Sequence, residues 1–389
     1  MIKSCYVHIP FCKNICSYCD FCKNYYDDTI VTKYLNNLKS EININYKGEI
    51  LNTLYIGGGT PSSLSKNNLK ILFDILKLLK LNSSYEFTFE CNYEDINEEL
   101  LVILKNNRVN RISIGIQTFN EKFSKILNRT INKKDMIEKI NLTKSYFSNI
   151  NIDLMYAMPG ESIDDLVNDL KVIKKLNVPH ISTYALILEE HTKLGLSNIK
   201  ELDEDIQNKM YYKIVSKLKD NGYNHYELSN FSKDGFSSKH NLTYWNNEQY
   251  YGFGVGASGF IDNVRYDNTK SIFRYNNGIT KIMEEKLTKE ELIKDEVMLG
   301  LRKIKGINIL KFEEKYKLSI NNIFDVSSLI KDKVLILKNN NLFIPEKYLF
   351  VSNEIILKLL DTYNLNWIKK YCIILTIVRR GLLWKKIII

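Results

Sequence analysis

The feature that most restricts the fold is an alternation of strand-like and helix-like segments over the first half of the 389-residue chain. Short runs rich in β-branched and aromatic residues alternate with longer amphipathic segments rich in lysine, leucine and isoleucine. The strand-like runs are 5–9, 52–56, 86–90, 111–116, 149–155 and 181–187, and the helix-like segments include 32–44, 66–79, 96–106 and 163–176. Six such units predict an α/β fold with parallel strands joined by right-handed crossovers, in a partly closed barrel or an open doubly wound sheet.

Polar and glycine residues collect where these predicted strands end. The second strand is followed by Gly57–Pro61, the third ends at Glu90, the fourth is followed by Gln117, and the fifth contains Asp153. Each of these alone is a weak signal, since a triple glycine can be a plain loop and a carboxylate can be a solvated residue at a strand end. Because ligands bind at the carboxyl ends of parallel strands, the repetition predicts a polar rim at that edge of the sheet.

Three cysteines, Cys12, Cys16 and Cys19, follow the first predicted strand with the spacing C-x3-C-x2-C. Structural zinc takes four protein ligands, whereas cubane iron–sulfur clusters are held by cysteine thiolates. Three ligands on a four-iron cluster leave one iron open to a molecule that is not protein. The alternative is three buried cysteines that act as small apolar residues. It is disfavoured by the polar residues between them, among them Lys13 and Asn14.

These motifs resemble the oxygen-independent coproporphyrinogen III dehydrogenase-like branch of the radical S-adenosylmethionine (SAM) superfamily, and most closely the HemW-type haem chaperones. The matching stretches are Tyr6-Val-His-Ile-Pro-Phe-Cys, Cys19-Asp-Phe, Ile56-Gly-Gly-Gly-Thr-Pro-Ser, Asn110-Arg-Ile-Ser-Ile-Gly-Ile-Gln, Asn151-Ile-Asp-Leu-Met-Tyr and His240-Asn-Leu-Thr-Tyr-Trp. The resemblance implies a partial (β/α)6 radical SAM barrel over 1–230, a linking region over 231–285 and a smaller, mainly helical, winged-helix-like domain over 286–362.

The resemblance also implies the site residues. Cys12, Cys16 and Cys19 would hold a [4Fe-4S] cluster whose open iron takes the amino and carboxylate groups of SAM. The SAM site would be lined by Tyr6, Tyr18, Gly58, Gly59, Thr60, Glu90, Gln117, Arg129, Asp153 and Ile187. In the family's chemistry, one electron from the cluster, which an electron donor must supply, cleaves SAM to a 5′-deoxyadenosyl radical. Cys22 falls one position later than a further cysteine of the dehydrogenases, so we treat it as a non-ligand.

His240 opens the motif His240-Asn-Leu-Thr-Tyr-Trp in an aromatic-rich region. A lone histidine among aromatic residues is more often a hydrogen-bonded structural residue than a ligand, although imidazole is a common haem ligand. In HemW-type proteins the histidine of this motif is implicated in haem binding. The resemblance therefore implies that His240 contacts haem.

Residues 288–360 have the pattern of a separate helical module, with helices at 289–301, 309–317, 326–339 and 352–360 and a short hairpin near 342–351. The resemblance implies a cap over the barrel mouth. A winged shape would also suit DNA, but the charges of the module are nearly balanced. We therefore expect a cap and no nucleic-acid partner.

The net charge of +10 comes largely from an atypical basic and apolar tail, 363–389, which holds six uncompensated basic residues. This tail could touch an anionic membrane surface weakly, or it could be an extension without a selected role. Seven cysteines, three of them at metal-ligand spacing, and the lack of an N-terminal signal favour the reducing cytoplasm.

We therefore expect a haem chaperone that binds haem as cargo, a [4Fe-4S] cluster and SAM, and that delivers haem to acceptor haemoproteins. The alternative is an oxygen-independent coproporphyrinogen III dehydrogenase, which decarboxylates two propionates of its substrate. It is disfavoured because the cluster motif begins at residue 12, without the N-terminal extension of those enzymes, and because Cys-x-Cys is absent. A radical SAM enzyme acting on an unrelated substrate is a third reading, since barrels host many chemistries.

Overall fold

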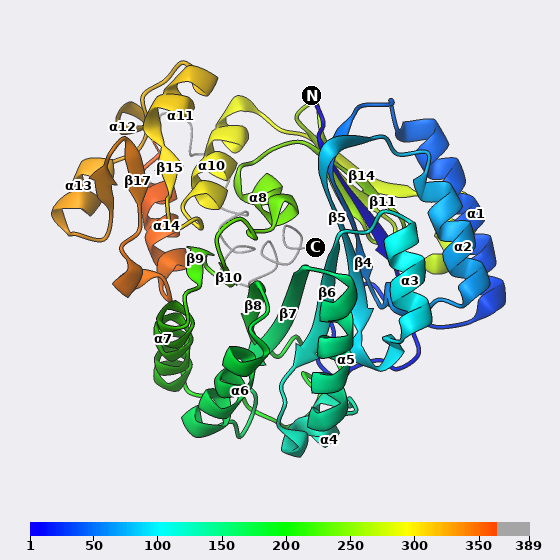
Figure 1. Cartoon of the computed structure of the whole chain (residues 1–389). Helices are drawn as coiled ribbons and strands as arrows, with labels where there is room; N and C mark the ends of the chain where they lie inside the picture. The colour runs from blue at the N-terminus through cyan, green and yellow to red at the C-terminus, as the bar shows by residue number, and fades with distance from the viewer. Residues whose placement is uncertain (364–389) are drawn as a thin grey trace.

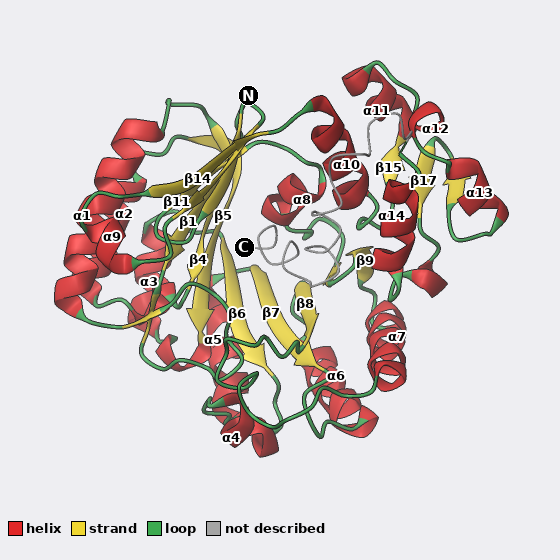
Figure 2. Ribbon diagram, turned by 180° about the vertical axis from the view of Figure 1, so that it is seen from behind, coloured by secondary structure: helices red, strands yellow, loops and turns green. Residues whose placement is uncertain are grey.

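A curved 12-stranded sheet organises the protein, whose computed structural model describes residues 1–363 (Figures 1 and 2). The strands, in the order in which they pair, are β14 (Lys281–Lys286), β13 (Val264–Asn268), β12 (Ser258–Ile261), β11 (Tyr250–Phe253), β1 (Ser4–Ile9), β4 (Leu51–Gly58), β5 (Leu81–Asn92), β6 (Arg111–Gln117), β7 (Asn149–Tyr156), β8 (His180–Ala185), β10 (Asn230–Ser232) and β9 (Asn224–Glu227). The tail 364–389, with the membrane-surface expectation that rests on it, lies outside the described residues.

The six predicted strands are confirmed as β1 and β4–β8, which pair in parallel with their neighbours as a partial (β/α)6 barrel requires. Seven helices follow in the same part of the chain: α1 (Asp28–Asn45), α2 (Lys66–Leu76), α3 (Glu98–Asn106), α4 (Ser124–Leu127), α5 (Lys133–Tyr146), α6 (Ile163–Leu176) and α7 (Glu204–Asp220). Strand β5 begins at Leu81, five residues earlier than predicted. The sequence pattern did not reveal this start because residues 82–84 are polar and show no alternation of apolar and polar residues. Two short strands, β2 (Phe11–Cys12) and β3 (Asn24–Tyr25), pair within the cysteine loop.

The strands present two different faces, because side chains alternate along a strand. On β6, Ile112, Ile114 and Ile116 are fully buried in the apolar core that the helices cover. Arg111 and Ser113 therefore point to the concave side, the barrel lumen. The polar residues of the strands line this lumen.

Residues 231–285 connect the barrel to the C-terminal domain, and they also extend the sheet. Strand β11 adds in parallel to β1, and β12, β13 and β14 follow as an antiparallel meander. The buried Glu41 carboxylate of α1 holds this extension, because it accepts hydrogen bonds from Gly254 N (2.9 Å), Asn268 Nδ2 (2.6 Å) and the Tyr275 hydroxyl (2.5 Å). Tyr275 lies on α9 (Ile272–Asn276).

The short helix α8 (Lys239–Trp245) covers the amino-terminal ends of β1, β4 and β5 from the concave side (Figures 1 and 2). The hydroxyls of Thr243 on α8 and Ser4 on β1 share a hydrogen bond of 2.8 Å. The buried Glu86 carboxylate on β5 accepts hydrogen bonds from Lys239 N (3.1 Å) and His240 N (3.0 Å). A carboxylate at this position satisfies backbone N–H groups that the first turn of a helix leaves unpaired.

The C-terminal domain combines helices with a three-stranded sheet. Its elements are α10 (Lys289–Gly300), β15 (Ile307–Asn308), α11 (Ile309–Tyr316), α12 (Ile320–Ile323), α13 (Val326–Lys331), β16 (Ile336–Lys338), β17 (Asn341–Phe343) and α14 (Ser352–Asp361). The helix predicted over 326–339 ends early, at Lys331, and the hairpin, formed by β16 and β17, lies at 336–343, mostly before the predicted 342–351. The hairpin turns at Asn339 and Asn340, whose positive φ angles of 50° and 58° suit a tight turn between antiparallel strands.

Backbone hydrogen bonds join the C-terminal domain to the sheet edge. Leu228 N donates to Arg302 O (3.2 Å), and Ile304 N donates to Tyr226 O (3.1 Å). Helix α10 also contacts α8, so the domain lies beside the helix that covers the strand starts. Within residues 1–363, no helix has both the length and the apolar character needed to cross a membrane.

The cap on α8 gives a first prediction. Replacing Glu86 by Ala should lower the free energy of unfolding by about 2 kcal/mol, because two buried N–H groups lose their acceptor. Glu99→Ala is the matched control, since this exposed glutamate only pairs with exposed Lys66 and should cost less than about 0.5 kcal/mol. Urea unfolding followed by circular dichroism measures both. Equal losses for the two variants would contradict this account of α8.

Candidate functional site

The three predicted cluster cysteines lie on the loop after β1, at the carboxyl ends of the strands. The Thr60 hydroxyl donates to Cys12 Sγ (3.4 Å), and Arg129 Nη1 donates to Cys16 Sγ (3.8 Å). Burial raises the pKa of the Cys12 thiol to about 11, and the nearby thiols of Cys19 and Cys16 act in the same direction. Cys12 is buried and Cys16 and Cys19 are partly buried. Three such thiols, which repel one another as thiolates, are suited to binding a cationic metal group, whose binding would release their protons.

Gly59 makes room for this loop. A Cβ atom built on Gly59 would lie 2.8 Å from the carbonyl carbon of Pro10 and 2.9 Å from Cys12 Sγ. Its own N–H donates to the carbonyl oxygen of Ile9 (2.9 Å), which keeps the end of β4 against the start of the loop. The backbone of β4 therefore approaches the cysteine sulfur as closely as a peptide can.

The carboxylate of Glu90, near the end of β5, accepts two hydrogen bonds. The Tyr55 hydroxyl donates to Oε1 (2.7 Å) and Gly58 N donates to Oε2 (3.1 Å). A Cβ atom on Gly57 would lie 2.9 Å from this carboxyl group. Burial raises the pKa of Glu90 to about 7, and the charge of Asp153 adds to the rise. Glu90 therefore changes its protonation near neutral pH, and a cation bound beside it would favour the ionised form.

Asp153, two strands away on β7, is the second carboxylate of the rim. Asn151 Nδ2 donates to its Oδ1 (2.7 Å), and the Ser113 hydroxyl donates to its Oδ2 (3.4 Å). Burial raises the pKa of Asp153, and these hydrogen bonds oppose the rise. Two carboxylates on one face can receive an ammonium group or a pair of hydroxyls.

Arg129 connects the rim to the cysteine loop. Its Nη2 donates to Asn92 Oδ1 (2.5 Å) and to the carbonyl oxygen of Gly115, while its Nη1 approaches Cys16. Gln117 ends β6 with a positive φ of 69°, an uncommon conformation for a residue other than glycine. Backbone strain of this kind gathers at binding sites that hold it in place.

Three further members of the predicted SAM set differ in their distance from this network. Tyr18 is half-buried on the cysteine loop, beside Cys16. Ile187 follows the end of β8 and is 55% exposed. Tyr6 is buried deeper in the lumen, where its hydroxyl and His8 Nδ1 share a hydrogen bond of 2.9 Å.

His8 holds the far end of the cysteine loop. Its Nε2 lies 2.7 Å from the carbonyl oxygen of Cys22, and burial lowers its pKa to about 4, so the ring is neutral and donates from Nε2. A Cβ atom on Gly58 would lie 2.7 Å from the ring, and the φ of Gly58 is +121°. Through its hydrogen bond to Cys22, His8 can orient the cysteine loop.

The structure places His240 at the opposite end of the barrel from the cysteines. Its Nδ1 and the Thr53 hydroxyl share a hydrogen bond of 2.8 Å, and its Nε2 shares another of 2.8 Å with the Tyr244 hydroxyl. The residue is 1% exposed, and burial lowers its pKa to about 3. Thr53 and Gly58 are five residues apart on β4, a separation of about 16 Å. His240 is thus a neutral, fully hydrogen-bonded imidazole that the fold does not bring to the cysteines.

Sequence reasoning missed two buried charged residues of the lumen, Glu86 and Arg111. Both lie at the start of predicted strands, where we treated them only as strand residues. The alternation along β6 was a signal for Arg111, since it shares a face with Ser113 and opposes Ile112.

Three further side chains meet beside the cysteine loop: Asp20, Glu189 and His191, with one potential ligand atom each within 4.8 Å of the others. His191 Nε2 is hydrogen-bonded to Asp20 Oδ1, which links the cysteine loop to the segment after β8. His191 is largely exposed. The pair therefore ties two loops together at the rim.

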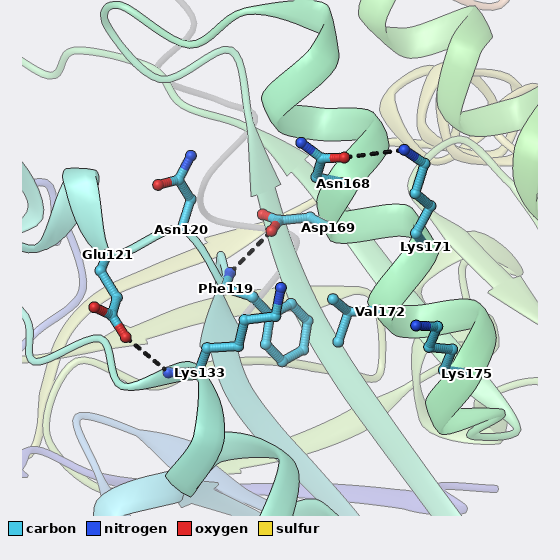
Figure 3. Close-up of a pocket in the computed structure, with 9 residues that line it drawn as sticks. All are labelled: Phe119, Asn120, Glu121, Lys133, Asn168, Asp169, Lys171, Val172 and Lys175. Carbon is cyan, nitrogen blue, oxygen red and sulfur yellow. Dashed lines mark hydrogen bonds between the residues drawn. The ribbon is translucent and has the colours of Figure 1, made fainter.

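A pocket of about 510 Å³ lies on the outer side of the barrel, between the segment after β6 and helix α6 (Figure 3). Asp169 lines it and accepts hydrogen bonds from the Thr118 hydroxyl (2.6 Å) and Phe119 N (3.2 Å). Its other lining residues include Lys133 and Lys175. The pocket contains no residue of the predicted cluster, SAM or haem sites.

Comparisons with known proteins agree on the two parts of the chain. Residues 6–173 match the model of the Radical SAM superfamily, and residues 287–350 match that of the HemN C-terminal domain. Among solved structures, the coproporphyrinogen III oxidase HemN from Escherichia coli, a radical SAM enzyme, superposes with a TM-score of 0.81 over 93% of this chain and 90% of that chain. At 21% identity this similarity establishes the fold.

Curated relatives resemble the chain over nearly its full length. "Heme chaperone HemW" of Lactococcus lactis subsp. lactis (strain IL1403) is 40% identical over 376 residues, 93% of this chain and 98% of the relative. "Heme chaperone HemW" of Bacillus subtilis (strain 168) is 39% identical over 348 residues, 85% of this chain and 91% of the relative. The chain therefore belongs to the HemW family of haem chaperones within the radical SAM superfamily.

Proposed function

We propose that this protein binds haem as cargo, carries a [4Fe-4S] cluster and SAM at the carboxyl ends of its barrel strands, and passes haem to acceptor haemoproteins. The observation that carries the proposal is the full-length similarity to relatives named as haem chaperones, together with the cysteine loop that they and other radical SAM proteins are expected to share. The six described cysteines are free, which fits a reducing cytoplasm.

Cys12, Cys16 and Cys19 would hold the cluster, because their thiols, one buried and two partly buried, lie together on one loop. Bound there, a cluster with three cysteine ligands supplies one-electron chemistry and one open iron, and it needs an external electron donor. The Arg129 guanidinium would stabilise the negative charge of the Cys16 sulfur. The Cys22 thiol instead donates to the carbonyl oxygen of Lys270 (3.4 Å), which supports its exclusion from the ligand set.

The rim around this loop would bind SAM, a zwitterion with a ribose diol. Glu90 and Asp153 suit the ammonium group and the ribose hydroxyls, and Arg129 suits the carboxylate. Gly59 and Thr60 would offer backbone groups to the methionyl end. Tyr6, Tyr18, Gly58, Gln117 and Ile187 complete the proposed set.

Haem ligation would fall to His240. Its neutral imidazole is the form that iron binds, but its Nε2 already shares a hydrogen bond with the Tyr244 hydroxyl. Because His240 lies on the buried face of α8 itself and is 1% exposed, ligation requires α8 to shift and this hydrogen bond to break.

The cluster assignment predicts the effect of cysteine removal. Alanine in place of Cys12, Cys16 or Cys19 should abolish the charge-transfer absorption and most of the bound iron after anaerobic reconstitution. Cys22→Ala is the matched control and should keep both. Loss of iron from the Cys22 variant alone would overturn the ligand assignment.

The shifted carboxyl predicts a pH dependence. Glu90 has a pKa of about 7, above its value in an unfolded chain, so it is largely neutral at lower pH and cannot then pair with an ammonium group. The affinity of the cluster-loaded protein for SAM should rise about tenfold from about pH 6 to about pH 8. Glu90→Gln should flatten the profile, whereas Glu98→Gln, on the exposed surface of α3, should keep it. A wild-type profile without this rise contradicts the pairing.

The haem assignment is tested by two variants with opposite expected effects. His240→Ala should weaken haem binding and change the Soret band, while cluster content persists because the cysteines lie at the other end of β4. Tyr244→Phe should strengthen haem binding severalfold, because it frees Nε2 of the imidazole. Unchanged haem binding in both variants would remove His240 from the site.

The cluster-loaded wild-type protein also allows a test of whether it acts as a haem chaperone or as a dehydrogenase. We expect the wild-type protein to bind haem and to release no carbon dioxide from coproporphyrinogen III under anaerobic, reducing conditions with SAM. Decarboxylation at catalytic rates would overturn the proposed function in favour of the dehydrogenase. A protein that neither binds haem nor decarboxylates would favour a radical SAM enzyme with another substrate.

A further inference from the structure

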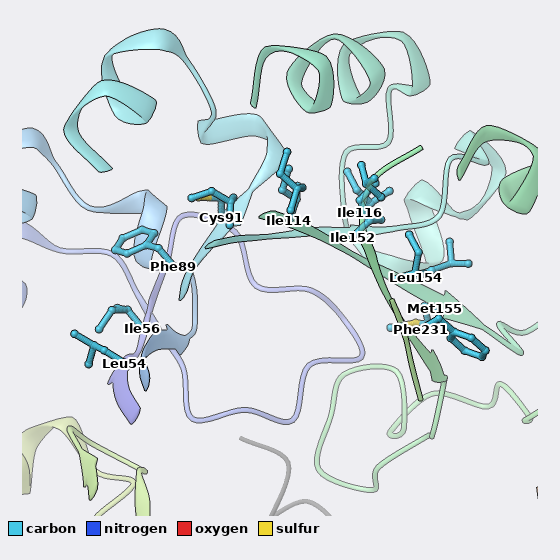
Figure 4. Packing of buried hydrophobic residues seen from close by; sticks show 14 of the residues in the cluster. Leu54, Ile56, Phe89, Cys91, Ile114, Ile116, Ile152, Leu154, Met155 and Phe231 are labelled. Atoms are coloured by element: carbon cyan, nitrogen blue, oxygen red, sulfur yellow. The ribbon is translucent and has the colours of Figure 1, made fainter. Parts of the chain in front are cut away.

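Arg111 is a positive charge inside the barrel. It is the first residue of β6, where it pairs with Thr88 on β5 and Asn149 on β7. Figure 4 shows Ile114 and Ile152 among the apolar side chains on the helix side of these strands. Because side chains alternate, Arg111 and Ser113 point to the other side, into the lumen.

The guanidinium of Arg111 forms neither a hydrogen bond nor an ion pair with residues 1–363, although it acts at longer range on the Glu90 and Asp153 carboxylates. The residue is 2% exposed, its Nε has no hydrogen-bond partner, and no hydrogen bond or ion pair joins its guanidinium to the described chain. Other sheltered arginines are paired: Arg129 donates to Asn92, and Arg265 forms an ion pair of 2.7 Å with Asp295. A buried charge that no hydrogen bond or ion pair compensates is costly, so a ligand whose acceptor atoms pair with it would recover part of that cost.

The nearest carboxylates do not fill this role, because other donors already satisfy them. Burial raises the pKa values of Glu90 and Asp153 and the charge of Arg111 only opposes the rise, while their hydrogen bonds come from Tyr55, Gly58, Asn151 and Ser113. On the other side, burial lowers the pKa values of His180 and His240, and Arg111 lowers them further. In the sheet register Arg111 pairs with Thr88, and Thr88 pairs with Tyr55, whose hydroxyl donates to Glu90 and whose ring lies 5.0 Å from that of His240. Arg111 therefore lies between the carboxylate rim and the imidazole that α8 carries.

We propose that Arg111 binds a carboxylate of the ligand that enters the lumen, namely a propionate of the porphyrin whose iron contacts His240. The assignment rests on the proposed function. A guanidinium forms a planar fork that matches a carboxylate with two parallel hydrogen bonds. The acidic neighbours would repel a doubly charged phosphate more strongly than a singly charged carboxylate, and a porphyrin joins its metal centre and propionates in one molecule.

The test compares haem with haem dimethyl ester, in which both propionates are blocked. Both are titrated into cluster-loaded wild-type protein, Arg111→Gln, Arg111→Lys and the control Arg108→Gln, which alters an exposed arginine of the same segment. Wild-type protein and the control should bind free haem about tenfold or more tightly than the ester. Arg111→Gln should bind both equally with unchanged cluster iron, and Arg111→Lys should keep part of the difference.

Equal affinity of wild-type protein for haem and its ester would overturn the role of Arg111, and so would a preference that survives Arg111→Gln. The wild-type comparison decides the matter even where a variant does not fold. Absence of any haem binding would instead overturn the proposed function. The comparison is then repeated with coproporphyrin III and its tetramethyl ester, and equal binding of these two would overturn the role of Arg111 independently.

Discussion

The functional end of the barrel depends on one steric constraint, the absence of side chains at Gly57–Gly59. A Cβ atom at these three positions would lie within 2.9 Å of the Glu90 carboxyl group, the His8 ring and Cys12 Sγ, respectively. Three groups with different chemistry therefore meet at the end of β4. Each occupies space that a side chain on one of these three glycines would fill. Their convergence connects the first strand, the cysteine loop and the third parallel strand into one site.

The two ends of the lumen differ in character. At the carboxyl ends of the strands lie thiols, carboxylates and strained backbone, and at the amino ends lie the hydrogen-bonded imidazole and tyrosine rings of His240 and Tyr244 on α8. Tyr6 lies between these two ends of the lumen, since its hydroxyl shares a hydrogen bond with His8 and its ring lies 6.5 Å from that of His240. A single lumen thus holds both proposed sites, with the Arg111 charge between them.

Local patterns were sufficient to predict the parallel strands and the polar rim. Each unit is short in sequence, and the rule that ligands meet the carboxyl ends of strands orders Glu90, Gln117 and Asp153 without knowledge of the third dimension. The position of His240 could not be predicted in this way, because it depends on contacts with Thr53 and Glu86, far away in the chain. For the same reason, residues 231–285 read as a connection, although pairing of β11 with β1 makes them part of the sheet.

The length of α8 has a consequence for access to the lumen. At seven residues it is well below the roughly 12–15 residues at which an isolated helix becomes even marginally stable in water. Its helical state is therefore supplied by its neighbours, and a segment that loses them melts into coil. Entry from this side would thus be a local unfolding event, governed by the opening free energy of about two helical turns and not by the swing of a rigid lid.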